Sequence, residues 1–176
     1  PNTRMVYVET PSNPGLELVD MAMIGKLCEK HGLIFNVDNC FSTPSLQAPA
    51  HFGAHLVVHP ATKFMEGQGR VLGGVVVGSK EYIKPLRFFC RQTGPSMSPF
   101  TAWVLSSSLE TLDLRMEKHC DNALKLAQAL EQLPEVKQVN YPFLPSHPQY
   151  ELATRQMSAG GGIITIDLEG GFDRVS

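Results

Sequence analysis

The stretch MVYVETPSNPGLELVDMAMIGKLCEKHGLIFNVD, residues 5–38, decides the fold class of this chain. It opens with a short apolar run, residues 5–8, and closes with a second one, residues 33–37, and both have the length of a buried strand. Between them, four apolar residues recur at helical intervals: Met21, Ile24, Leu27 and Cys28. Strand, helix and strand in this order predict an α/β fold with a parallel or mixed sheet covered on both faces.

Turn and cap residues mark the ends of these elements. The segment TPSNPG, residues 10–15, is rich in turn formers and predicts a loop after the first strand. Asp20 stands where the N-cap of the helix belongs, and Gly32 stands at the position that ends it. The boundaries of the strand–helix–strand unit are therefore predicted on both sides.

Two further strands follow, and polar residues come directly after some of the strands. Residues 56–59 form an apolar run before Pro60, and residues 75–77 form another between glycines. Asp38 follows the second strand and Lys63 follows the third. Because functional side chains in such sheets gather at the carboxyl ends of the strands, Asp38 and Lys63 are the first candidate site residues.

The second half of the chain is mainly helical and then changes character. A helix is expected at residues 82–91 and a long helix at residues 100–133, of a length that often bridges two domains. Pro134 would end this helix. Beyond it the sequence predicts a strand, a helix and a strand, at residues 136–141, 150–155 and 163–168. We therefore expect residues 1–133 to be the end of one domain with its bridging helix, and residues 134–176 to begin a smaller, incomplete α+β domain.

Composition excludes several classes of protein. The chain has 176 residues, of which 43% are hydrophobic and 18% are charged, as in globular domains. The formal net charge of -2, without a basic stripe, argues against a nucleic-acid partner. No apolar stretch approaches the about 20 residues of a membrane helix, and the first residues do not resemble a signal peptide. Without an initiator methionine, the chain is expected to be a piece of a longer protein.

The cysteines favour a reducing compartment. None forms a CxxC pair or a metal-ligand spacing, so reduced and mostly buried thiols in the cytoplasm are the expectation. The four residues are Cys28, Cys40, Cys90 and Cys120.

Lys63 and Asp38 together are suited to one kind of chemistry. A lysine shielded from water is a nucleophile toward an aldehyde, and pyridoxal phosphate (PLP) requires such a lysine. PLP also requires a carboxylate that keeps its pyridine nitrogen protonated, so that the ring can accept electrons. Taken singly, a loop lysine is more often a solvated surface residue and a strand-end aspartate is more often a cap. Their combination after two neighbouring strands is what indicates a site.

Three motifs then carry a resemblance to a family. The segment HLVVHPATKFMEGQG, residues 55–69, resembles the lysine signature of the Cys/Met-metabolism PLP enzymes. ETPSNP, residues 9–14, and NVDNCFSTPSLQ, residues 36–47, resemble its other two markers in the same order. The family includes cystathionine synthases and lyases, methionine γ-lyase and homoserine sulfhydrylases. Further segments, residues 67–78, 93–103 and 144–153, are most similar to its bacterial O-succinylhomoserine sulfhydrylase branch.

The resemblance implies a fold, a cofactor and roles for four residues. The fold would be the large PLP-binding domain of a fold-type I, aspartate-aminotransferase-like enzyme. Lys63 would hold PLP as a Schiff base and move protons at the substrate, and Asp38 would pair with the pyridine nitrogen. Thr62 would give its hydroxyl to the cofactor phosphate, and Asn13 would lie near the phenolic oxygen or the substrate carboxylate.

The resemblance also implies a reaction and an assembly. The reaction would be γ-replacement on O-succinylhomoserine, in which sulfide takes the place of succinate and homocysteine is formed for methionine biosynthesis. Cystathionine γ-synthase or γ-lyase activity is the alternative within the family. The assembly would be a homotetramer built as a dimer of dimers. Other parts of the family's site have no match in this chain, so the 176 residues alone are expected to be inactive.

The chain departs from the family pattern at two positions. Pro60 stands where the family usually has a serine that donates to the phosphate, and proline has neither a hydroxyl nor an amide hydrogen. One lost charge-assisted hydrogen bond costs on the order of 1.5–3 kcal/mol. His55 stands where the family usually has aspartate, and a structural role is expected for it. Pro60 is the feature that favours the alternative of another class, a scaffold that has lost turnover.

Other candidate sites are weaker. His51, His55 and His59 recur every four residues, but a strand and Gly53 interrupt the helical spacing that a metal site would need. We therefore predict no metal. The glycines of residues 67–74 match neither nucleotide-loop pattern. Cys40 is expected to be a buried thiol and not a nucleophile, because no histidine stands near it in the sequence.

Overall fold

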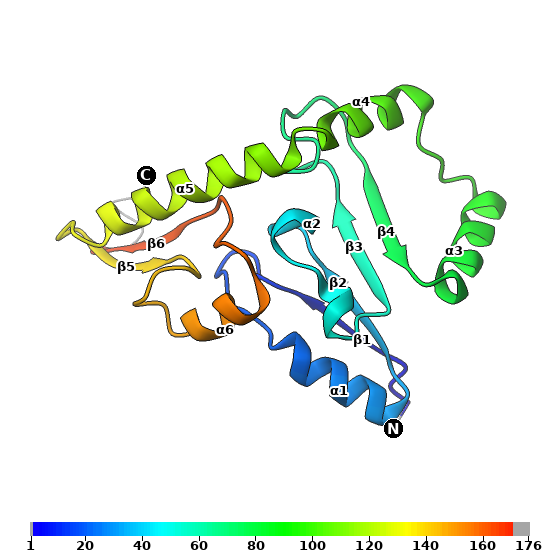
Figure 1. Ribbon diagram of the computed structural model, residues 1–176, viewed down its shortest axis with the longest axis horizontal. Helices are drawn as coiled ribbons and strands as arrows, with labels where there is room; N and C mark the ends of the chain where they lie inside the picture. The colour runs from blue at the N-terminus through cyan, green and yellow to red at the C-terminus, as the bar shows by residue number, and fades with distance from the viewer. Residues whose placement is uncertain (1, 171–176) are drawn as a thin grey trace.

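The computed structural model describes residues 2–170, and its centre is a four-stranded sheet (Figure 1). The strands are β1 (Met5–Glu9), β2 (Ile34–Asp38), β3 (Leu56–Pro60) and β4 (Gly74–Gly78), in this order across the sheet. The first three run parallel and β4 runs antiparallel to β3. The predicted mixed sheet is therefore confirmed.

Helix α1 (Met21–His31) packs against this sheet as the pattern predicts (Figure 1). The Asp20 carboxylate accepts the Met23 backbone N–H at 2.9 Å, and Gly32 ends the helix in the left-handed region at φ 61°. The apolar face buries Met21 and Cys28 against β2. Both predicted caps are confirmed.

The far edge of the sheet is not covered as predicted. All five residues of β4 are exposed, and α3 (Lys80–Thr93), which follows it, buries none of its residues within the described chain. By contrast, the middle residues of β2 are buried. The prediction of a sheet covered on both faces is therefore wrong for β4. Within residues 2–170, no element buries β4 or the helix α3 that follows it. The helix is also longer than the predicted residues 82–91.

The single long helix predicted at residues 100–133 is wrong. Two helices occupy this stretch, α4 (Pro99–Leu109) and α5 (Leu112–Leu130). The Ser108 hydroxyl donates to the Val104 carbonyl at 2.8 Å, an interaction that bends helices. The Ser108 carbonyl then accepts from Thr111 N–H, and this hydrogen bond forms the short turn between the two helices.

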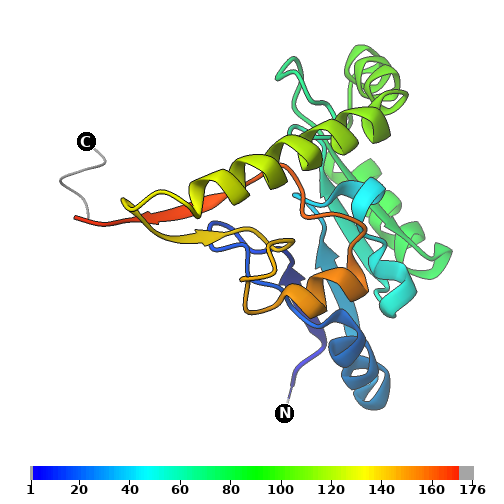
Figure 2. The same ribbon diagram turned by 60° about the vertical axis from the view of Figure 1, so that its left-hand side comes forward.

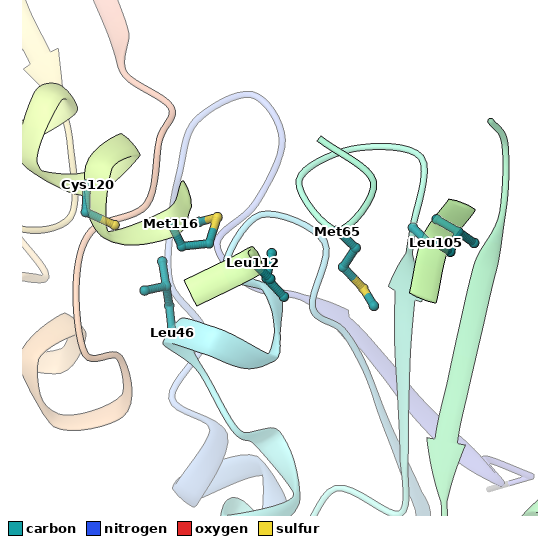
Figure 3. Close-up of a cluster of buried hydrophobic side chains, with 7 residues drawn as sticks. Leu46, Met65, Leu105, Leu112, Met116 and Cys120 are labelled. Atoms are coloured by element: carbon teal, nitrogen blue, oxygen red, sulfur yellow. The ribbon is translucent and has the colours of Figure 1, made fainter. Parts of the chain in front are cut away.

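Helix α5 joins two cores. Its first half buries Leu112, Met116 and Cys120 in the cluster drawn in Figure 3, which includes Leu46 of the short helix α2 (Thr43–Leu46). A 3-10 turn, η1 (Pro49–Phe52), follows α2. The second half of α5 belongs to a different cluster, formed mainly with β5 and the loop that follows it. Within the described residues α5 thus contributes to two clusters, and the bridging of two domains stays a prediction.

The end of the chain forms a separate two-stranded antiparallel sheet. Its strands are β5 (Val136–Asn140) and β6 (Thr165–Leu168), and α6 (Tyr150–Gln156) lies between them in sequence. Figure 2 shows α5 running alongside this sheet. The three elements predicted after Pro134 are confirmed, with slightly shorter strands. The domain boundary near Pro134 stays a prediction.

Two glutamines attach this last part to the first loop. The Gln149 side chain accepts the Leu18 N–H and donates to the Leu18 carbonyl, both at 2.7 Å. Gln156 makes the same pair of contacts with Met21 N–H and the Val19 carbonyl. Each amide pairs with the backbone as a neighbouring strand would, and so the loop before α1 is fixed in place.

None of the helices in residues 2–170 combines the length and the apolar character that a membrane span requires.

Candidate cofactor site

The carboxyl ends of β1, β2 and β3 meet at one edge of the sheet. Glu9 at the end of β1 lies opposite Asp38 at the end of β2, and Asp38 lies opposite Val58. The segment of residues 61–67, here called the lysine turn, follows β3 at the same edge. The two residues predicted to be functional are therefore brought to one edge by the parallel pairing of their strands.

One oxygen of the Asp38 carboxylate has a partner and the other does not. The Tyr7 hydroxyl donates to Asp38 Oδ2 at 3.1 Å. Asp38 Oδ1 is one of five buried side-chain atoms without a hydrogen-bond partner among the described residues; the others belong to Asn36, Ser42, Gln47 and His59. Of the five it is the carboxylate oxygen, and since buried carboxylate oxygens are ordinarily satisfied, Asp38 is suited to a donor from outside this chain. A protonated pyridine nitrogen is such a donor, and the residues present fit PLP at this position.

A buried polar network supports the Asp38 strand end. The Gln47 amide donates to Asn39 Oδ1 at 2.8 Å and to the Thr10 carbonyl at 2.9 Å. The Asn39 amide in turn donates to the carbonyls of Thr43 and Gln47, both at 2.9 Å. This network holds Thr43 in the left-handed region at φ 58°, which is strained for a β-branched residue. It explains the presence of Asn39 and Gln47 in the motif of residues 36–47.

The lysine turn presents Lys63 away from the core. Ala61 and Met65, four residues apart, are buried in the cluster of Figure 3. Lys63 lies between them in sequence and is exposed, with Nζ 5.3 Å from the centre of the Phe41 ring. The expected shielding of this lysine from water is therefore not found within residues 2–170.

The charges of Lys63 and Asp38 act on the same neighbours. Burial raises the pKa of Glu9, with Asp38 raising it further and Lys63 lowering it. Burial likewise raises the pKa of the Cys40 thiol, against the lowering effect of Lys63. Cys40 is thus a buried, protonated thiol, as expected, and not an activated nucleophile. Both groups lie within the field of the lysine and the aspartate, so the two form one electrostatic site.

The remaining predicted residues lie around this site with fewer contacts. Thr62 is half-buried directly before Lys63. Pro60 is the last residue of β3 and lies opposite Gly74. Asn13 is exposed, and no hydrogen bond joins it to Asp38 or Lys63 in the described part of the chain. Its loop is nevertheless tied down, because the Thr165 hydroxyl donates to the Pro14 carbonyl at 2.7 Å.

The histidines have structural surroundings. His55 accepts the Phe35 N–H at Nδ1, 3.0 Å away, and packs edge-on against Tyr82. An aspartate in its place could accept the same N–H, which accounts for this departure from the family pattern. Burial lowers the pKa of His59 in β3. Among residues 2–170 no three His, Cys, Asp or Glu side chains gather as metal ligands would.

The cysteines also follow the sequence prediction in most respects. Cys28, Cys40 and Cys120 are buried and Cys90 is exposed, and all four are free within the described residues.

Comparison with known proteins places this arrangement in a family. The model of the family described as "Cys/Met metabolism PLP-dependent enzyme" matches residues 1–176. The chain belongs to this family. Its members depend on PLP, which agrees with the unpartnered Asp38 oxygen and the lysine at the same edge.

Curated relatives have several activities. The chain is 49% identical to an O-succinylhomoserine sulfhydrylase of Pseudomonas aeruginosa, over 98% of this chain and 43% of the relative. It is 45% identical to an L-methionine gamma-lyase of Treponema denticola, over 98% of this chain and 44% of that one. The chain thus spans less than half the length of the relatives it matches.

Solved structures confirm the fold class. A cystathionine gamma synthase from Xanthomonas oryzae pv. oryzae matches with a TM-score of 0.95 and 39% identity, over 98% of this chain and 45% of that one. The metB protein of Corynebacterium glutamicum matches with a TM-score of 0.94 and 43% identity, over 97% and 44%. The fold is that of the fold-type I PLP enzymes, as predicted.

Sequence reasoning missed several residues of the site. Tyr7 and Glu9 precede the turn motif on β1, and strand alternation could have placed them on the Asp38 face once the register of β1 and β2 was known. Phe41 lies inside the motif of residues 36–47, but no local pattern marks it as a neighbour of Lys63. Arg115, which contacts the lysine turn from α5, has no local signal at all.

Proposed function

We propose that this chain binds PLP covalently through Lys63, with Asp38 facing the pyridine nitrogen, in an enzyme that replaces the succinyloxy group of O-succinylhomoserine by sulfide. The observation that carries the proposal is the sheet edge that Asp38 and Lys63 share, where the buried Asp38 Oδ1 has no hydrogen-bond partner among residues 2–170. The identity of 49% to an O-succinylhomoserine sulfhydrylase supports the choice of reaction. Thr62 and Asn13 are proposed as ligands of the phosphate and of the phenolic or substrate oxygens.

The residues of the chain divide the work. When bound, PLP supplies an electron sink for negative charge developed on the substrate. Asp38 keeps the pyridine nitrogen protonated, and the Tyr7 hydroxyl orients the carboxylate for this task. Lys63 Nζ is free to accept and return protons at the substrate Cα and Cβ after it is released from the cofactor. In the net reaction a Cγ–O bond breaks, succinate leaves, and a Cγ–S bond to sulfide forms.

The first test is chemical trapping. The natural protein, purified at its full length and loaded with PLP, is reduced with borohydride and digested, and the modified peptide is identified by mass spectrometry. We expect the pyridoxyl group on Lys63. A folded protein without an adduct at Lys63 would overturn the proposal and favour a scaffold without turnover, for which the loss of a phosphate donor at Pro60 is the physical reason.

A second candidate function differs only in the nucleophile. The methionine gamma-lyase and cystathionine gamma synthase relatives match almost as well, so cystathionine formation or γ-elimination is the alternative. Assays with sulfide, with cysteine and without an added acceptor separate the three reactions. A rate with cysteine that exceeds the rate with sulfide would replace the sulfhydrylase proposal by the γ-synthase.

The proposed enzyme needs more than these residues. We propose a dimer-of-dimers assembly of the full protein, and we expect the 176-residue chain alone to form no homocysteine. Measurable homocysteine formation by the isolated chain would contradict this expectation.

A further inference from the structure

The lysine turn is a tight turn closed by two backbone hydrogen bonds. Glu66 N–H donates to the Ala61 carbonyl at 2.9 Å, and Gly67 N–H donates to the Lys63 carbonyl at 2.7 Å. Gly67 has φ 79°, the left-handed conformation that commonly follows the last residue of a helix. The carbonyls of Phe64 and Met65 lack partners within this turn, as the last carbonyls of any helix do.

Arg115 of α5 supplies those partners. Its guanidinium donates from Nη1 to the Phe64 carbonyl and from Nη2 to the Met65 carbonyl at 3.1 Å. The same group donates to the Ser108 carbonyl at 2.9 Å and to Thr111 Oγ1 at 3.2 Å. One planar cation thus caps both the lysine turn and the end of α4.

A second arginine ties the outer side of the turn to the same place. Glu66 accepts from Gln68 N–H, Arg70 N–H and Arg70 Nε at 2.9, 3.0 and 2.6 Å. Arg70 Nη2 then donates to Ser108 Oγ at 2.7 Å. The break between α4 and α5 is therefore the point where both arginines meet, and it lies against the turn that carries Lys63.

We infer that Arg115 is the positioning residue of Lys63: it fixes the lysine turn through the Phe64 and Met65 carbonyls and so sets the direction of Nζ. This inference rests on the proposed role of Lys63. The buried side chains of Ala61 and Met65 hold the turn from the core side. The two hydrogen bonds from Arg115 are the ties that attach directly after Lys63, at the Phe64 and Met65 carbonyls, and they come from a helix rooted in the same core.

Gly67 is part of the same arrangement. A Cβ built on Gly67 would lie 2.8 Å from Arg115 Cζ, closer than real contacts allow. Gly69 also has positive φ, at 70°, but a Cβ there would meet nothing within 4 Å. Alanine at the two positions therefore introduces similar backbone strain and displaces Arg115 at only one of them.

The test measures how fast Lys63 captures the cofactor. Full-length protein freed of PLP is mixed with PLP, samples are reduced with borohydride over time, and the Lys63 adduct is quantified by mass spectrometry. Visible circular dichroism of the bound cofactor reports its orientation. We expect Arg115→Lys to change the dichroic band and to slow capture at least about tenfold, a loss of the size found when residues that orient metal ligands are replaced. Arg87→Lys, the same change on exposed α3, should match the wild type.

The glycine pair gives an independent reading. Gly67→Ala should slow capture as Arg115→Lys does, whereas Gly69→Ala should leave the rate and the dichroic band near those of the wild type. Capture at the wild-type rate in folded Arg115→Lys would overturn the inference, as would equal behaviour of the two glycine variants. Failure of Arg115→Lys to fold, with Arg87→Lys folded, would also overturn it, since Arg115 would then serve folding alone. A wild type that never modifies Lys63 would instead refute the proposed function.

Discussion

Asp38 and Lys63 lie at the same edge of the sheet but are held there in different ways. Asp38 ends a strand that pairs on both sides, so backbone hydrogen bonds place it. Lys63 stands in a turn held by individual side chains, above all Arg115 and the Glu66–Arg70 pair. A strand end tolerates many sequences, whereas a turn held in this way depends on a few residues far along the chain.

The largest effect is expected at the sheet edge itself. Asp38→Asn keeps the shape of the side chain but removes the charge that would hold the pyridine nitrogen protonated. We expect turnover by the full-length protein to fall by about 10²- to 10³-fold, the usual cost of losing one preorganised electrostatic partner. Steady-state kinetics measure it. Glu9→Gln, which removes the neighbouring carboxylate, is the control, and an equal loss there would mean that Asp38 has no special position.

The next effect sharpens the comparison from the core side of the lysine turn. Met116 is fully buried beneath the turn, so Met116→Ala should lower the free energy of unfolding by about 2–5 kcal/mol. Leu114 on the same helix is 68% exposed, and Leu114→Ala should change it by less than about 0.5 kcal/mol. Urea unfolding of the full-length protein gives both values. Equal losses of unfolding free energy in the two variants would show that burial of Met116 does not stabilise the fold.

The outer tie of the lysine turn should respond to pH. Burial by itself raises the pKa of Glu66, but the hydrogen bonds from Arg70 and Gln68 lower it to about 2, from an ordinary value of 4.5. A carboxylate with a lowered pKa stabilises the fold fully above pH 4.5, and this contribution is lost as the pH falls toward about 2. Glu66→Gln should flatten the acid limb of the stability curve in this window. Thermal unfolding measured between these pH values gives this slope. An unchanged slope in Glu66→Gln would refute the stabilising role of the Glu66–Arg70 contact.

The smallest effect is expected at the start of β3. His55→Ala leaves the Phe35 N–H without its acceptor, which costs about 1–3 kcal/mol for a buried donor. His55→Asp should recover most of this loss, because its carboxylate can accept the same hydrogen. Thermal unfolding compares the two variants with the wild type. If aspartate were no better than alanine, the edge-on contact with Tyr82 would be the main function of His55.

Some features of the fold could not be predicted because they depend on distant residues. The break between α4 and α5 falls in the stretch SLETL, residues 108–112, where no glycine or proline marks it, and it becomes favourable only when Arg115 can reach the Ser108 carbonyl and the lysine turn at once. The exposure of β4 was also missed, since its valines and flanking glycines resemble those of a covered strand. In both cases the local pattern was correct and the packing partner decided the outcome.

Local sequence is enough to predict the strand–helix–strand order, the caps of α1, and the placement of Asp38 and Lys63 after neighbouring strands, because periodicity, caps and turn residues act over a few positions. Tertiary packing, in contrast, leaves Asp38 Oδ1 without a partner among residues 2–170, brings the Tyr7 hydroxyl to Oδ2, and lets Arg115 cap the lysine turn. These contacts join residues up to 51 positions apart, and no local pattern encodes which distant donor a buried oxygen will find.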